Sequence, residues 1–93
     1  MKTIHKYELK ISRTQLIDMP AEAEPLSIQV QHANSVHEKI CMWALVNPNV
    51  AVTKYSVTLV ETGSGIKNAV GEYVGTVQLQ NGSYVLHAFI KEA

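Results

Sequence analysis

One segment of the sequence combines residue types suited to holding an anion: residues 62–68, which read TGSGIKN. Glycines let the backbone N–H groups of a loop turn towards a negative charge, and a lysine adds a positive one. The spacing fits neither a phosphate-binding P-loop nor a dinucleotide-binding Rossmann turn. The segment predicts a site for a small anionic or polar ligand, and the alternative is a plain flexible connection. The predicted ligand-binding residues are Thr62, Gly63, Ser64, Gly65 and Lys67, with Lys54 and Arg13 nearby.

The four histidines do not show the spacing of a metal site. His32 and His37 form the one close pair, with Glu38 beside them. Zinc sites usually combine histidine with cysteine at short spacings, so this pattern predicts solvated loop histidines and no bound metal. His5 and His87 fall on strands near opposite ends of the chain and become neighbours if those strands pair. We expect both to be structural histidines that are held by hydrogen bonds.

No combination of side chains predicts a catalytic centre. Cys41 lies in the most apolar run of the chain, which indicates a buried thiol, because a reactive cysteine needs a partly exposed, electropositive setting. Ser35 and His37 are close in sequence, but no glycine-flanked turn presents the serine as a nucleophile. The sequence therefore predicts a protein that is not an enzyme and has no cofactor.

The aromatic residues allow two interpretations. Trp43 and the four tyrosines are able to stack on a nucleic-acid base. Trp43 lies in an apolar strand, however, and aromatic side chains in such strands pack in a core or at a subunit interface. We expect the second role. The tyrosines are Tyr7, Tyr55, Tyr73 and Tyr84.

A hydrophobic period of two predicts the elements that position these residues, and it indicates an all-β, mainly antiparallel fold. Residues 25–32 alternate, with Leu26 and Val30 expected inside the core. In residues 3–11 the face that ends in Ile11 is expected inside. The six predicted strands are residues 3–11, 25–32, 39–46, 54–61, 73–80 and 83–90.

Two of these strands carry a further expectation. Residues 39–46 are apolar on both faces, which is typical of a central strand or of one covered by a partner subunit. In residues 54–61, Tyr55 is expected in the core, whereas Ser56 and Thr58 are expected on a solvated face.

The connections are read from turn residues. Asn81-Gly82 between two alternating runs predicts a hairpin with a type I′ turn, which needs positive φ at both positions. Residues 14–24, which contain Pro20 and are followed by Pro25, are expected to be a connection, with a short helical turn at residues 12–15 as the only helical element. Six strands at this spacing predict a sandwich, a small barrel or one curled sheet.

Composition limits the class of protein. The 93 residues are expected to form one domain, residues 1–93, of ordinary globular composition with 46% hydrophobic residues. A net charge of zero argues against binding to duplex DNA. There is no apolar run that predicts a membrane helix or a signal peptide, and a single cysteine fits a reducing cytoplasm. A domain this small is marginal alone, so a homo-oligomer is expected.

The order of several motifs resembles a family of small phage and prophage proteins that carry a domain-of-unknown-function label. The resemblance covers nearly the whole chain, and it departs at a longer hairpin around residues 33–40. The matching segments are residues 4–9 (IHKYEL), 25–31 (PLSIQVQ), 42–48 (MWALVNP), 73–78 (YVGTVQ) and 85–89 (VLHAF), with Met19-Pro20 and Thr62-Gly63 between them.

The resemblance implies origin, not mechanism, and it has no catalytic residues to transfer. Small phage proteins often act on the host, which leads to the expectation of a counter-defence protein that sequesters a small anionic nucleotide signal in the cytoplasm of the bacterial host. Two alternatives stay open at this point. One is an inhibitor that docks on a host defence protein through a strand edge or the hairpin at residues 33–38. The other is a virion accessory protein.

Overall fold

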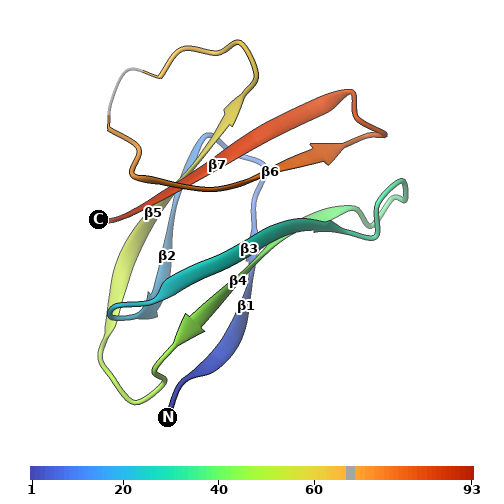
Figure 1. The fold of residues 1–93 in the computed structure, drawn as a ribbon. Helices are drawn as coiled ribbons and strands as arrows, with labels where there is room; N and C mark the ends of the chain where they lie inside the picture. Colours follow the sequence, from blue (N-terminus) through green and yellow to red (C-terminus); the bar gives the residue numbers. More distant parts are fainter. Residues whose placement is uncertain (67–68) are drawn as a thin grey trace.

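The computed structural model describes residues 1–66 and 69–93, and this part of the chain contains seven β-strands and no helix (Figure 1). No helix in these ranges is therefore long and apolar enough to cross a membrane. The strands are β1 (Thr3–Leu9), β2 (Thr14–Pro20), β3 (Glu24–Gln31), β4 (Lys39–Val46), β5 (Val52–Glu61), β6 (Glu72–Leu79) and β7 (Tyr84–Glu92).

The strands form two antiparallel sheets that pack face to face. Sheet A has the order β1-β4-β3, and sheet B has the order β2-β5-β7-β6. The two sheets lie one over the other in Figure 1, with β3 and β6 close to each other on one side. The all-β antiparallel prediction is confirmed, and of its three architectures the sandwich is correct. The six-stranded curled sheet and the small barrel are wrong, because there are seven strands in two separate sheets.

The core forms where the inward residues of both sheets meet. β4 lies in the middle of sheet A, and its inward side chains Ile40, Met42, Ala44 and Val46 are 0–1% exposed. Burying a side chain of this size contributes about 1.5–3 kcal/mol relative to leaving it in water. The expectation that residues 39–46 form a central strand is confirmed. On the outer face of β4, Cys41 is also fully buried.

The strand that the sequence did not predict is β2. Residues 14–24 were expected to be a connection, with a helical turn at residues 12–15, and both expectations are wrong. β2 does alternate, since Ile17 and Met19 point inwards, but Leu16 between them is 59% exposed and hides the pattern. β2 is an edge strand, and Pro20 at its last position is tolerated there because an edge strand needs fewer backbone donors.

Two further differences concern which residues face the core. β1 ends at Leu9, so Ile11 lies beyond the strand and is 55% exposed instead of buried. In β3 the pairing with β4 shifts between Pro25 and Ser27, which leaves Leu26 as the extra residue of a β-bulge. Leu26 is consequently 47% exposed, although alternation had placed it in the core.

The β3–β4 and β6–β7 hairpins project from the same end of the molecule and are joined there (Figure 1). Asn81 and Gly82 have φ angles of 57° and 86°, so the predicted turn with positive φ at both residues is confirmed. The Glu38 carboxylate accepts hydrogen bonds from the backbone N–H of Asn34 at 3.1 Å and of Gln80 at 3.0 Å. One side chain thus ties the two hairpins together.

The glycines of the segment between β5 and β6 give a graded test of backbone strain. Gly71 has φ +96° and a Cβ there would meet the Ile90 carbonyl oxygen, Gly63 has φ +90° with open space, and Gly65 has neither restriction. We expect Gly71→Ala to lower the free energy of unfolding by roughly 3 kcal/mol or more, Gly63→Ala by about 1–2 kcal/mol, and Gly65→Ala by less than about 0.5 kcal/mol. Urea denaturation of the three variants measures this, and equal losses at all three positions would contradict it.

A partly buried tyrosine predicts a loss of stability at alkaline pH. Burial raises the pKa of Tyr7 above its usual value of 10.0, and the neighbouring Tyr55 raises it further. Above pH 10 the unfolded chain ionises this phenol while the folded chain keeps it protonated, so its contribution to stability is complete below that pH and is lost as the pH rises. We expect Tyr7→Phe to lose less stability than the wild type between pH 9 and about 11, measured by urea denaturation. An identical loss in both proteins would show that another group is responsible.

Candidate functional site

The connection between β5 and β6, which the structure describes at residues 62–66 and 69–71, must cross the outer face of sheet B. β5 and β6 both pair antiparallel with β7, which lies between them, so β5 and β6 run parallel. A connection between parallel strands has to return from the end of one strand to the start of the next, and here β6 begins at Glu72, level with Val57 of β5. We call this connection the crossover. It explains why β5 is buried on both faces, with Ser56 at 9%, Thr58 at 6% and Val60 at 3% exposure.

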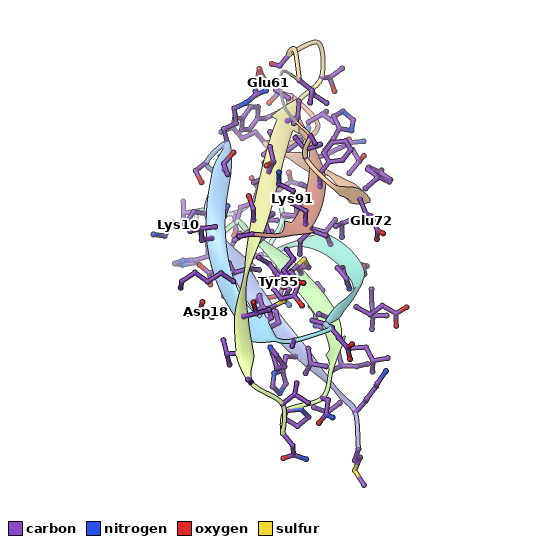
Figure 2. All side chains as sticks on the ribbon, turned by 90° about the vertical axis from the view of Figure 1, so that its left-hand side faces the viewer. Lys10, Asp18, Tyr55, Glu61, Glu72 and Lys91 are labelled. Carbon is purple, nitrogen blue, oxygen red and sulfur yellow. The ribbon has the colours of Figure 1, made fainter. Side chains whose placement is uncertain are left out.

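A cleft of about 550 Å³ lies between the crossover and the outer face of sheet B. Figure 2 views the molecule from the side of β2 and β5, with Lys91 next to β5. We call this space the crossover cleft. Its lining comes from four parts of the chain, which are β2 with the residue before it, β5, β7 and the crossover itself. The lining residues are Arg13, Thr14, Ser56, Thr58, Lys91, Gly65, Ile66, Ala69 and Val70.

The chemistry of the crossover cleft is cationic and hydroxyl-rich on the side of the sheet. Arg13 and Lys91 supply two positive charges, and Thr14, Ser56 and Thr58 supply three hydroxyl groups. Among the lining residues that the structure describes there is no carboxylate, imidazole or thiol. The crossover side is mostly apolar. The cleft therefore offers charge and hydrogen bonds on one wall and a hydrophobic surface on the other.

Arg13 holds the crossover in place as well as lining the cleft. Its guanidinium Nη2 donates a hydrogen bond to the Gly65 carbonyl oxygen, 52 residues away in sequence. The Arg13 carbonyl in turn accepts the backbone N–H of Leu59 at 2.7 Å, which fixes the residue against β5. The sequence placed Arg13 near the 62–68 loop, and the structure brings the two together.

The remaining predicted site residues fall into different places. Ser64 lines a separate smaller cleft of about 290 Å³ on the other side of Arg13, together with Glu61. Gly63 forms the turn after β5. Lys54 lies on the outer face of β5 and pairs with Asp18 at 2.8 Å, so within one chain it does not line the crossover cleft. Lys67 lies outside the described residues.

Thr62 begins the crossover in a hydrogen-bonded chain on the outer face of sheet B. Its Oγ1 lies 2.7 Å from His87 Nε2, and the other ring nitrogen of His87 lies 2.9 Å from Thr76 Oγ1. Tyr73 OH extends the chain to Thr76 at 2.6 Å. The expectation of a hydrogen-bonded histidine is confirmed for His87. His5 is not its neighbour, because β1 belongs to sheet A and β7 to sheet B.

The other candidate groups lie away from the cleft. His32 and His37 are exposed at the hairpin end, and the described residues contain no group of three or more histidine, cysteine or acidic side chains that could hold a metal ion. Cys41 is buried as predicted, with its Sγ 3.4 Å from Gln31 Oε1. Of the tyrosines, Tyr55 is in the core as expected, whereas Tyr73 is 60% exposed and packs edge-on against Phe89.

Seven lining residues were not identified from the sequence as site residues, and four of them are polar: Thr14, Ser56, Thr58 and Lys91. Ser56 and Thr58 were assigned to a solvated face, which is the outer face of sheet B, but the crossover covers it. The signal that was available is the length of the glycine-bearing connection, which is too long for a hairpin between neighbouring strands. Thr14 belongs to the unpredicted strand β2.

A family model described as "Domain of unknown function (DUF7352)" matches residues 1–93. The chain belongs to the DUF7352 family. This confirms the part of the sequence resemblance that concerned a domain of unknown function. No curated protein and no solved structure matches the chain. The description of DUF7352 assigns no role to any residue, so the function has to be argued from the crossover cleft itself.

The hydrogen-bonded chain predicts how the start of the crossover is held. Thr62→Val removes the hydroxyl that bonds His87 and preserves the shape of the side chain. We expect a loss of about 1 kcal/mol in the free energy of unfolding and faster amide hydrogen exchange at residues 63–66. Thr3→Val, at the exposed start of β1, is the matched control. Unchanged exchange at residues 63–66 in Thr62→Val would show that the bond to His87 does not hold the crossover.

Proposed function

We propose that this protein is a non-enzymatic binding protein that holds a small anionic, nucleotide-like ligand in the crossover cleft. The observation that carries the proposal is that Arg13 and Lys91 line the same cleft, together with three residues that carry hydroxyl groups. Guanidinium and ammonium groups are the side chains that bind phosphate best, and hydroxyls add hydrogen bonds to phosphate or sugar oxygens.

The size and the two walls of the cleft suit a ligand with a charged and a flat apolar part. A volume of about 550 Å³ lies within the range of about 300–1,000 Å³ typical of small-molecule sites. The apolar crossover side chains Ile66 and Val70 face the polar wall. A nucleotide matches this division, because its phosphate needs cations and its base needs an apolar surface.

The same chemistry supports binding rather than turnover. General acid–base catalysis needs a group that gains and loses a proton near neutral pH, usually histidine or a carboxylate. The described lining of the crossover cleft contains neither a histidine nor a carboxylate. A cleft of this kind holds an anion without a group to transform it.

The biological setting of the proposal rests on the sequence resemblance to phage and prophage proteins. In that setting, a binding protein without turnover acts by sequestration. We propose that it works in the cytoplasm of a bacterial host and removes a nucleotide signal of the host's defence. This part of the proposal is supported by the order of motifs along the chain and not by the cleft.

A second candidate is docking on a host protein through the hairpin at residues 33–38. The observation that favours it is Val36, an apolar side chain that is 96% exposed at the tip of this hairpin. The Glu38 carboxylate stabilises the same loop by accepting a hydrogen bond from the Asn34 backbone N–H. This candidate needs no ligand in the crossover cleft, so the experiment below separates the two.

Calorimetric titration with cyclic and ADP-ribose-type nucleotides tests the ligand. We expect the wild type to bind at least one of them, and we expect Arg13→Gln and Lys91→Gln each to weaken that binding by about tenfold or more, because a charged hydrogen bond to phosphate is lost. Lys6→Gln, an exposed lysine on the outer face of sheet A, is the matched control and should bind like the wild type. A folded protein that binds none of the nucleotides would overturn the proposal and favour docking on a protein.

A further inference from the structure

The edge of sheet B at β2 is unpaired and carries an exposed apolar side chain. Among the described residues, β2 pairs with β5 alone, so its second edge has backbone N–H and C=O groups without a strand partner. Leu16, the third residue of the strand, is 59% exposed. Natural proteins usually protect such an edge with charges, prolines or bulges, because an open edge invites pairing with another chain. In β2 such protection is confined to the second half of the strand, where Asp18 carries a charge and Pro20 is the last residue.

The opposite side of the sandwich is closed, so the open edges among the described strands are those of β1 in sheet A and β2 in sheet B. β3 and β6 pack against each other across the two sheets, and Gly75 of β6 is so close to Ile28 of β3 that a Cβ would collide with it. Sheet B has one strand more than sheet A. Because β3 and β6 are held together on the closed side, the additional strand of sheet B, β2, lies on the open side.

We propose that two copies of this chain pair antiparallel through β2, with Leu16 on the two-fold axis. In antiparallel pairing between identical strands the axis has to pass through a residue, and residues at equal distances from it lie opposite each other. The charges and apolar groups of β2 then select the register, since opposite residues share a face.

The register centred on Leu16 gives matched partners on the outer face. Leu16 meets Leu16 of the second copy, and Thr14 lies opposite Asp18 of the second copy, where its hydroxyl can donate to the carboxylate. A register centred on Ile17 places Leu16 opposite a carboxylate, and one centred on Asp18 places two carboxylates together. The Leu16 register also brings the positive charge of Arg13 next to the negative charge of Asp18 in the second copy.

This pairing has a consequence for the crossover cleft, which rests on the proposed function. Within one chain, Thr14 pairs with Thr58, and Asp18 pairs with Lys54. The Leu16 register joins these pairs into one row across the two-fold axis, from Thr58 and Thr14 to Asp18 and Lys54 of the second copy. Lys54 therefore comes to the rim of the second copy's cleft, although it does not line the cleft of its own chain.

Sedimentation equilibrium without ligand tests the assembly. We expect a dimer for the wild type and, for Leu16→Lys, a dimer dissociation constant raised at least roughly tenfold, because two like charges meet on the axis. Since Leu16 is exposed, this variant should keep the wild-type circular dichroism. Leu26→Lys, at an exposed leucine of sheet A, is the matched control and should stay dimeric. A monomeric wild type, or a Leu16→Lys dimer of unchanged strength, would overturn the proposal.

Cysteine cross-linking tests the register. Opposite Cβ atoms on paired strands lie about 4.5–5.5 Å apart, so Leu16→Cys should form a covalent dimer with a short thiol cross-linker. In Asp18→Cys the two introduced thiols are four residues apart along the strands, about 13 Å, and should not be joined. Cross-linking of Asp18→Cys in place of Leu16→Cys would contradict the Leu16 register.

The contribution of Lys54 is separable from the assembly. Lys54→Gln should weaken binding of the nucleotide identified by calorimetry by several-fold while the protein stays dimeric, since the lysine lies off the axis. Unchanged nucleotide affinity in this variant would remove Lys54 from the site and leave the dimer in place. If the wild type binds none of the nucleotides, the proposed function is overturned. The sedimentation experiment does not depend on that outcome, because it is carried out without ligand.

Discussion

The position of β7 between two parallel strands is the constraint on which the candidate site depends. Because β5 and β6 are parallel, their connection cannot be a hairpin and has to pass over the outer face of sheet B. The crossover buries part of the outer face of sheet B, which would otherwise be solvated. It also creates a space between the polar surface of the strands and the apolar side of the crossover. The cleft is a by-product of strand order, and strand order is a long-range property of the fold.

Sequence patterns predicted the structure well where the backbone conformation depends on neighbouring residues alone. The Asn81-Gly82 turn is correct because positive φ at two consecutive positions is a local requirement. The predictions failed where tertiary context reversed a local pattern. Leu16 is apolar but exposed, which hid β2, and Leu26 was expelled from the core by a bulge that alternation cannot reveal.

The site was predicted only in part, for a related physical reason. Arg13 and Gly65 were both identified, and they do meet, because a cation and a glycine loop suggest anion chemistry on their own. Ser56 and Thr58 were treated as surface residues, since only the sheet order shows that a connection covers them. The alternation of side chains shows which residues share a face of a strand. It does not show whether another segment of the chain covers that face.

The link made by Glu38 between the two hairpins limits how this end of the molecule is able to change. The Glu38 carboxylate accepts hydrogen bonds from the main-chain amides of residues 34 and 80, so the side chains of those two residues take no part in the link. The amino acids at those two positions are therefore free to vary among types that tolerate positive φ, as both do here. Insertions in either turn are different, because they would move an amide out of reach. This link therefore restricts the lengths of the two hairpin tips together, and it restricts their composition much less.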